Sequence, residues 1–289
     1  MYAWWGRLLR INLTTGKISV NEIDRDVLVK FIGGRGLAVK ILWDELPAGV
    51  DPLSPYNKLV IAGGPLSGIP APSSGKLVVA SKSPLTNGYG DGNIGTMASV
   101  QLKKTGFDAI VIEGAAKKPV YIYIEDEKVE IRDADHLWGL DTFTTEDKLL
   151  REHGRNVGTL IIGPAGEHLV RYATIVSMKG RSGGRPGIGA VMGSKRVKAI
   201  VVKGTKEPNL ANPEEYRKVV ESSYRDILKS DNYDYWIRQG TMATIVWSHQ
   251  NSCLPTMNFR EGVWELHDTI SGDLMEKLKV DRRGCPYCY

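Results

Sequence analysis

The chain has 289 residues, of which 42% are hydrophobic and 25% are charged, and its formal net charge at pH 7 is +5. These proportions are typical of a folded soluble protein. The net positive charge is mild, and the basic residues are interleaved with acidic ones, so we predict no basic stripe that would bind nucleic acid. The charge does not exclude a bound anion. The sequence contains no run of about 18 apolar residues, so no membrane span is predicted. The N-terminus also lacks a signal-peptide pattern, and we therefore expect a cytoplasmic protein.

Apolar alternation and glycine or proline turns predict the elements of the chain. In chain order, the first half is predicted to contain a β-hairpin over 7–23, helices over 24–32 and 37–46, strands over 57–62 and 77–82, a glycine-rich loop over 88–95, a helix over 96–105 and a strand over 109–114. The second half is predicted to contain a hairpin over 120–132, a helix over 144–152, strands over 159–162 and 171–176, a second glycine-rich loop from 180 and a strand over 199–202.

The stretch 180–195 is the most informative of these segments. It has five glycines in its first ten residues, and Arg181 and Arg185 flank the glycine pair. Glycines let the backbone approach a ligand, arginines donate paired hydrogen bonds to phosphate, and the small residues from Ala190 predict a helix start. The stretch therefore predicts an oxyanion site. Two plainer interpretations stay open: a surface loop without a ligand, or arginines paired with a carboxylate such as Glu167.

The order of elements repeats, which predicts an internal duplication over about 57–119 and 157–208. Each copy runs through strands, a glycine-rich loop and a helix, and closes on Ala-Ile-Val, at Ala109 and at Ala199. Two such loops suggest a ligand with two similar anionic halves. Glycine becomes sparse after about residue 208, so we place a domain over 1–208 and the start of a helical domain over 209–289.

Several segments together resemble the tungsten-containing aldehyde ferredoxin oxidoreductase family. They are residues 4–13, 83–86, 162–167, 189–195 and 285–288, and the 88–93 loop with Lys76 looks most similar to the formaldehyde-oxidising branch. The resemblance implies an α+β fold, with a duplicated, pseudo-twofold, β-rich N-terminal domain followed by the start of a mainly helical domain. It also implies oxidation of aldehydes to carboxylic acids, with ferredoxin as the electron acceptor.

In that family the N-terminal domain carries tungstopterin, a tungsten ion held by four dithiolene sulfurs of two pterins, and no protein side chain is needed as a metal ligand. The resemblance assigns Lys76, Asn93 and Gly95 to one pterin, and Arg181, Ser182, Gly184 and Arg185 to the other. The backbone carbonyls of Asn93 and Ser182 would face a Mg²⁺ ion that bridges the phosphates, which suits magnesium's preference for oxygen. No residue of this chain is assigned a catalytic role.

The resemblance also implies that Cys285 and Cys288 are the first two ligands of a [4Fe–4S] cluster, with the remaining cysteines farther along. We therefore expect this chain to be the N-terminal portion of the enzyme. The expected partners are ferredoxin and a small aldehyde, with no nucleic acid or membrane and with a possible homo-oligomer. A zinc half-site or a redox pair is the alternative for the two cysteines.

Two other functions compete with this interpretation. One is a truncated, non-catalytic pterin-binding module. The other is a nucleotide-binding protein, since 90–95 reads G-x-G-x-x-G and Glu113 ends the next strand. Without the resemblance, Lys76 would be a solvated lysine and Asn93 as readily a turn residue as a ligand contact. We expect Cys253 to be buried, and we expect packing roles for three tryptophans, Trp236, Trp247 and Trp264.

Overall fold

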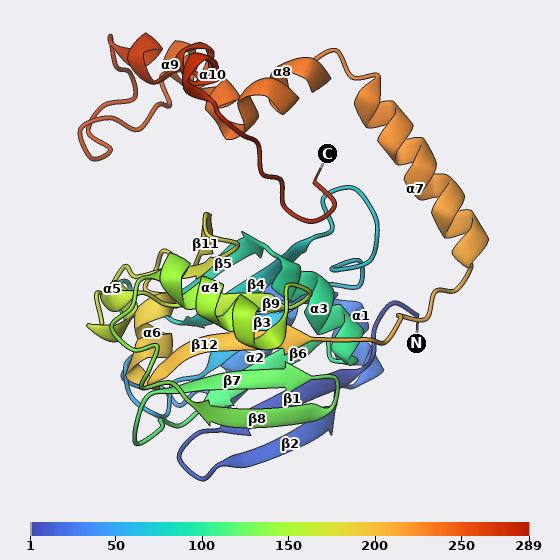
Figure 1. Cartoon of the computed structure of the whole chain (residues 1–289), viewed down its shortest axis with the longest axis vertical. Helices are drawn as coiled ribbons and strands as arrows, with labels where there is room; N and C mark the ends of the chain where they lie inside the picture. Colours follow the sequence, from blue (N-terminus) through green and yellow to red (C-terminus); the bar gives the residue numbers. More distant parts are fainter. Residues whose placement is uncertain (1, 289) are drawn as a thin grey trace. The chain divides into compact units, whose positions relative to one another are not determined.

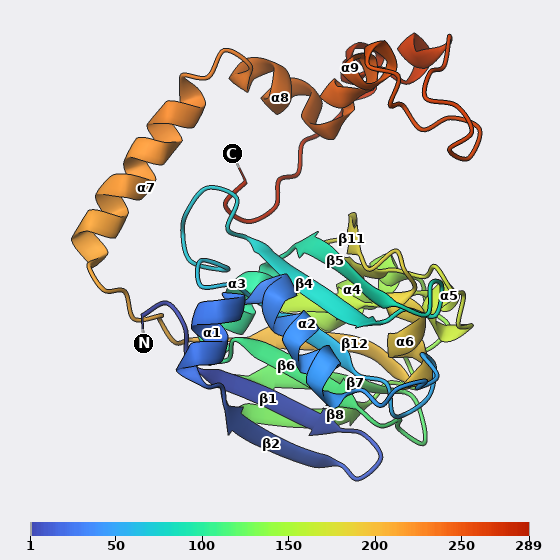
Figure 2. The same cartoon turned by 180° about the vertical axis from the view of Figure 1, so that it is seen from behind.

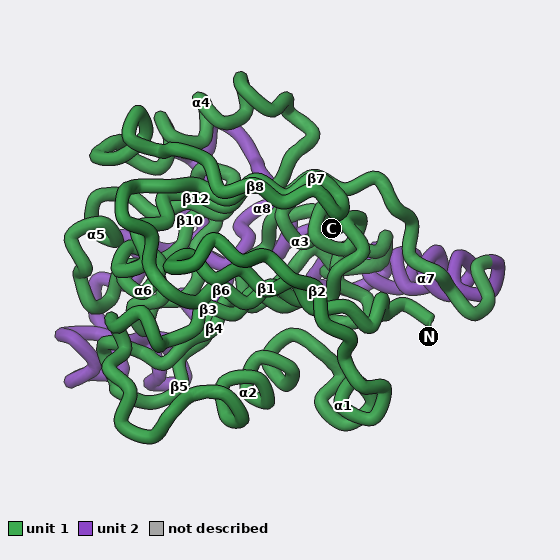
Figure 3. The backbone as a smooth tube through the Cα atoms, turned by 90° about the horizontal axis from the view of Figure 1, so that it is seen from below, with its two compact units in different colours: residues 1–213, 285–288 green, residues 214–284, 289 purple. Residues whose placement is uncertain are grey.

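The computed structural model describes residues 2–288. They form two compact units, one of residues 2–213 with 285–288 and the other of residues 214–284 (Figure 3). The first unit contains every strand, and the second is helical, so the fold is α+β as expected. The predicted boundary near residue 208 lies in the segment that follows the last strand of the first unit.

Six strands form the first sheet, in the order β2-β1-β6-β3-β4-β5. Their bounds are β1 Arg7–Asn12, β2 Lys17–Glu22, β3 Leu59–Ala62, β4 Lys76–Lys82, β5 Tyr89–Gly95 and β6 Ala109–Glu113. β1 pairs with β6 in parallel, and the other neighbours are antiparallel. β5 is therefore an edge strand of the first sheet.

The second sheet repeats this plan with the next six strands, in the order β11-β10-β9-β12-β7-β8. Their bounds are β7 Val120–Glu125, β8 Lys128–Asp133, β9 Gly158–Ile161, β10 Ile175–Ser177, β11 Arg181–Gly183 and β12 Val197–Lys203. In the reverse direction the second sheet reads β8-β7-β12-β9-β10-β11, which matches the order of the first sheet with six added to each strand number. The parallel pair β7–β12 corresponds to the parallel pair β1–β6. The fold is duplicated, and the matching strands begin at β1 and β7, ahead of the segments where the sequence repeat is visible.

Apolar side chains from both sheets form one core between them, including Leu9, Ile110, Ile122 and Ile200, each 0% exposed. Two helices complete this core, and each contacts the sheet of the other copy. α3 (Met97–Thr105) packs on β9 and β12, whereas α6 (Ile188–Ser194) contacts β3 and β4 as well as β12. The two copies are therefore interlocked by their helices.

Other helices cover the outer faces of the sheets. α1 (Arg25–Phe31) and α2 (Gly34–Glu45) lie over the first sheet (Figure 2), where α2 packs on β3 and β4. α4 (Thr142–His153) lies over the second sheet (Figure 1) and contacts β9. The Asp141 carboxylate accepts two amide hydrogen bonds at the start of α4, which is why that helix begins there. α5 (Pro164–Glu167) is a single short turn.

The second unit consists of short helices. They are α7 Pro213–Leu228, α8 Tyr233–Gln239, η1 Gly240–Ala243, α9 Thr244–Gln250, η2 His267–Ile270 and α10 Gly272–Leu278. Within it Cys253 is exposed, so the expectation that it is buried is wrong, and Trp236 and Trp247 are 49% and 61% exposed. None of the helices in residues 2–288 has both the length and the apolar character that a membrane crossing needs.

Candidate functional site

The first glycine-rich segment, predicted as a loop, is the strand β5. It pairs with β4 so that Lys76 lies opposite Gly95 and Val78 lies opposite Asn93. Opposite and alternate residues share a face, so Lys76 and Asn93 lie on the same face of the sheet, and both are exposed. The G-x-G-x-x-G pattern is thus part of an antiparallel edge strand and does not form a turn from a strand into a helix, which contradicts the nucleotide-binding alternative.

The second glycine-rich segment begins as the short strand β11, which pairs with β10. Arg181 lies opposite Ser177, and Ser182 lies opposite Val176. Arg181 is half-buried, Ser182 and Arg185 are exposed, and Gly184 is buried with a φ of +81°. β10 begins only at Ile175, so the predicted strand over 171–176 starts too early.

The edges of the two sheets meet at glycines of β5 and of the β11 end (Figure 1). A Cβ on Gly92 would lie 2.8 Å from the Gly183 carbonyl carbon and would overlap the Gly184 nitrogen. A Cβ on Gly183 would lie 3.1 Å from the Asn93 oxygen. Only residues without a side chain allow backbones this close. The two groups of predicted cofactor residues therefore flank one junction between the copies.

Backbone carbonyls already bind the first amides of α6, so these amides are not free to donate to an oxyanion. Ile188 N donates to Gly184 O (3.0 Å), Gly189 N to Ala173 O (2.9 Å) and Ala190 N to Gly187 O (3.0 Å). Gly187 and Gly189 are also needed for packing, since a Cβ on either would overlap a carbonyl group of the chain around residues 171–174. The helix start is structural, and only the side chains and the β11 edge remain for a ligand.

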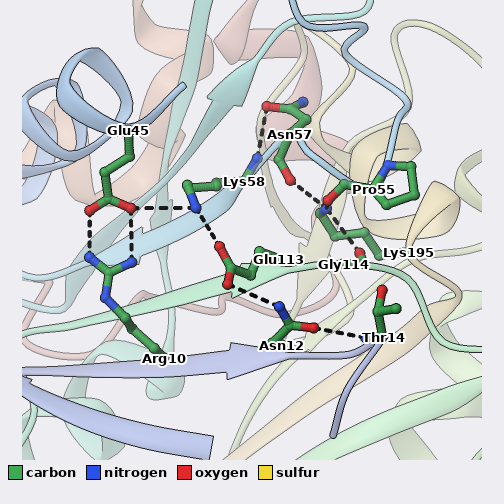
Figure 4. Close-up of polar contacts among 10 residues, drawn as sticks. All are labelled: Arg10, Asn12, Thr14, Glu45, Pro55, Asn57, Lys58, Glu113, Gly114 and Lys195. Atoms are coloured by element: carbon green, nitrogen blue, oxygen red, sulfur yellow. Dashed lines mark hydrogen bonds and ion pairs between the residues drawn. The ribbon is translucent and has the colours of Figure 1, made fainter. Parts of the chain in front are cut away.

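The Lys195 side chain, which ends the motif, also has a structural environment (Figure 4). It is 0% exposed, and its Nζ donates to three carbonyl oxygens of the first copy: Asn57 O at 2.5 Å, Gly114 O at 3.1 Å and Pro55 O at 3.4 Å. Burial, reinforced by the nearby charge of Lys58, lowers the pKa of Lys195 from 10.5 to about 7. Lys195 is therefore a tie between the copies and is not available to a ligand.

Beside Lys195 lies a network of charged groups that the sequence did not predict (Figure 4). Arg10 forms a two-pronged ion pair with Glu45, and Lys58 binds both Glu45 (3.4 Å) and Glu113. Glu113 also accepts a hydrogen bond from Asn12. These contacts lower the pKa of Glu113 although its partial burial opposes them. Glu113, the acidic residue of the nucleotide-binding alternative, is thus already satisfied by protein groups.

A second unpredicted group lies beside Asn93 on β5. Arg35 of α2 forms an ion pair with Asp91, and the Tyr89 hydroxyl donates to the same carboxylate (3.0 Å). Burial and the Asp91 charge raise the pKa of Tyr89, so it stays a neutral hydrogen-bond donor. Asp91 lies two residues from Asn93 and on the same face. No local pattern predicts this contact, because Arg35 lies in a separate helix.

The two cysteines of the C-terminal motif lie in the first unit, at the end of β4 and β5. Cys285 packs on Gly95, where a Cβ would lie 2.8 Å from the Cys285 Cβ and overlap its sulfur. Ser73 N donates to Tyr287 O (2.9 Å), which fixes the segment further. Within residues 2–288, no three His, Cys, Asp or Glu side chains form a metal-binding group. The structure thus brings Cys285 against Gly95, which lies opposite Lys76 in the β4–β5 pair.

Comparison with known proteins agrees with this architecture. Residues 8–204 match the family model "Aldehyde ferredoxin oxidoreductase, N-terminal domain", and residues 218–289 match "domains 2 & 3" of that family. Tungsten-containing aldehyde ferredoxin oxidoreductases from Pyrococcus furiosus and Thermococcus kodakarensis are 43% and 42% identical over 100% of this chain and 48% of their own length.

More distant functions also occur among the similar proteins. The aliphatic sulfonate oxidoreductase WOR-like subunit of Pyrococcus furiosus is 36% identical over 93% of this chain and 45% of its own length. The active-site complex BamBC of benzoyl coenzyme A reductase has a solved chain that superimposes with a TM-score of 0.75 at 35% identity, over 89% of this chain and 36% of that one. The chain spans about half the length of the curated relatives it matches. It belongs to the aldehyde ferredoxin oxidoreductase family.

Proposed function

We propose that this chain is the cofactor-binding part of an oxidoreductase that converts aldehydes to carboxylic acids and passes the electrons to ferredoxin. The cofactors would be tungstopterin, a [4Fe–4S] cluster and Mg²⁺. Family membership and the names of the relatives at 42–43% identity support the reaction class. The observation that carries the proposal for this chain is the glycine junction between β5 and the end of β11, where both groups of cofactor residues meet.

The residues at this junction fit a cofactor with two phosphates. Lys76 and Asn93 lie on the β4–β5 side, and Arg181, Ser182 and Arg185 lie on the β11 side. Each side therefore offers a cation and polar groups, and Arg181 offers the planar fork that suits phosphate, while Lys76 offers a point charge. The Asn93 and Ser182 carbonyls are the kind of hard oxygen ligand that Mg²⁺ prefers.

When bound, the cofactor would supply the redox chemistry, and the chain would bind it and set its surroundings. Lys76 and Arg181 would neutralise phosphate charge, and Gly92 would let β5 and the end of β11 lie close enough for both sides to hold one cofactor. Cys285, packed on Gly95, would hold one cluster ligand beside the pterin-binding edge. The aldehyde and ferredoxin would bind to the complete enzyme.

Analysis of bound metal and pterin tests this proposal. Protein purified from a host that makes tungstopterin should hold tungsten or molybdenum and pterin in proportion to the chain. Arg181→Ala should lose most of both, whereas Arg155→Ala, an exposed arginine of the same unit, should lose neither. Full retention by Arg181→Ala would contradict the assigned residues, and pterin-free wild type would contradict the function. Pterin without aldehyde-dependent dye reduction would instead identify a non-catalytic binding module.

A further inference from the structure

We propose that Glu146 is a positioning residue for the cofactor, because its buried carboxylate holds the turn that leads Arg181 and Ser182 into the site. This inference rests on the proposed function of the β11 edge. Glu146 lies in α4, far from Arg181 in sequence, and only 4% of it is exposed. No signal in the sequence marks it, since glutamate in an amphipathic helix is ordinarily solvated.

The carboxylate of Glu146 is bound by neutral donors from two different segments. Its Oε1 accepts from Met178 N (2.9 Å) and from the Thr159 hydroxyl (2.5 Å), and its Oε2 accepts from Lys179 N (2.7 Å). Across residues 2–288, no lysine or arginine forms an ion pair with it. Burying a charged carboxylate is energetically costly unless hydrogen bonds satisfy it, so these three neutral donors stabilise the buried carboxylate of Glu146.

The turn that Glu146 holds has an unusual backbone conformation. Met178 and Lys179 have φ values of +49° and +60°, in the left-handed region that residues with a Cβ avoid. Their consecutive amides point toward the same carboxylate. Such a conformation persists where the surroundings enforce it, and Glu146 supplies that enforcement. The turn ends directly before Arg181, the first residue of β11.

The same turn also contacts the first copy next to Gly95. The buried hydroxyls of Ser177 and Thr96 are hydrogen bonded at 2.6 Å, and Met97 N donates to the Met178 sulfur at 3.3 Å. Residues 96 and 97 follow β5, and residues 177 and 178 precede β11. Glu146 therefore sets the position of the Arg181 side of the junction relative to the Gly95 side.

The variant Glu146→Gln tests this role, because it keeps the shape but places an amide NH₂ against a backbone amide or the Thr159 hydroxyl. Asp147→Asn is the matched control: Asp147 is the next residue of α4 and contacts Lys179 through the lysine side chain only (2.7 Å). Two quantities are measured: bound pterin per chain, and amide hydrogen exchange of residues 177–182 with β12 as the internal reference.

We expect Glu146→Gln to hold at least fivefold less pterin and to exchange faster at residues 177–182, with β12 unchanged and Asp147→Asn like wild type. Wild-type pterin content in Glu146→Gln, equal exchange gains in β12, or an equal pterin loss in Asp147→Asn would overturn the inference. If Glu146→Gln does not fold, Thr159→Val can be used, because it removes only the hydroxyl donor to Glu146. This variant should show a smaller loss of pterin and a smaller gain in exchange at residues 177–182. Unchanged pterin content and exchange in Thr159→Val would overturn the inference. Failure of the proposed function is distinguishable, because wild type would then lack pterin while exchange still reports on the turn.

Discussion

Replacing Lys195 with methionine should destabilise the first unit, because this side chain ties the second copy to three carbonyls of the first. Methionine has nearly the same length and can fill the space, so the change removes the hydrogen bonds with little change in packing. The carbonyls of the buried residues Asn57 and Gly114 would then lose the amine donor, whereas the Pro55 carbonyl keeps a hydrogen bond from the Gly114 amide (2.9 Å).

The expected loss follows from the cost of unsatisfied buried acceptors. Each such group costs about 1–3 kcal/mol, so the two buried carbonyls would cost about 2–6 kcal/mol. The amine, when charged, carries a desolvation penalty that its removal recovers, which reduces the net loss. A net loss of about 2–4 kcal/mol in the free energy of unfolding is a large part of the ~5–15 kcal/mol typical of a folded domain.

The effect should depend on pH, since the pKa of Lys195 is about 7 in the folded protein and is expected to return to 10.5 on unfolding. Between these values the unfolded chain binds more protons than the folded chain, so stability from this group rises with pH. A difference of one pKa unit corresponds to about 1.4 kcal/mol. From pH 7 to pH 9, wild type should therefore gain on the order of 2 kcal/mol relative to Lys195→Met.

Urea unfolding of both proteins at pH 6, 7, 8 and 9 measures this difference. Lys128→Met is the control, because Lys128 is exposed and its ion pair with Glu130 lies at the surface, where such pairs contribute little. A loss below about 1 kcal/mol at every pH, or a loss that shrinks as the pH rises, would refute the reasoning about Lys195.

Two further substitutions test close approaches at the candidate site. Gly92→Ala should separate β5 from the β11 end and reduce bound pterin, and the overpacking should cost about 1–3 kcal/mol of stability. Gly88→Ala should be nearly neutral, because its new Cβ would lie 3.7 Å from the nearest atom. Equal pterin content in the two variants would contradict a cofactor site at the glycine junction. Gly95→Ala should displace Cys285 and speed its alkylation, measured by mass spectrometry against exposed Cys253. Gly180→Ala, with open space around it, should not change that rate, and an unchanged rate in Gly95→Ala would contradict the contact.

Regular apolar patterns made most of the fold predictable. The hairpin β1–β2, the buried strands β3 and β12 and the helix α3 were expected close to their observed positions, because alternation and glycine or proline turns act locally. β5 was missed because three of its seven residues are glycines, which usually indicate a loop. Its pairing with β4 over seven residues overrides that weak local preference.

The candidate site was only partly predictable. The resemblance supplied residues such as Lys76 and Arg181, but the groups that support them come from distant segments. Arg35, Glu146 and the carbonyls around Lys195 lie 56, 32 and up to 140 residues from their partners. Contacts of this range depend on how the sheets and helices pack, and no local motif specifies them. Charged groups whose partners lie far away in the sequence are therefore the part of the site that only the structure reveals.

The glycines of the two glycine-rich segments serve two different structural purposes, and this distinction decides where the ligand site is expected. Gly187 and Gly189 let α6 pack closely on neighbouring backbone, whereas Gly92 and Gly183 let two sheet edges meet. A cofactor held at that meeting point is held by both copies at once, unlike a phosphate held at one helix start. Any change that moves β5 away from β11 should therefore weaken both halves of the cofactor site together.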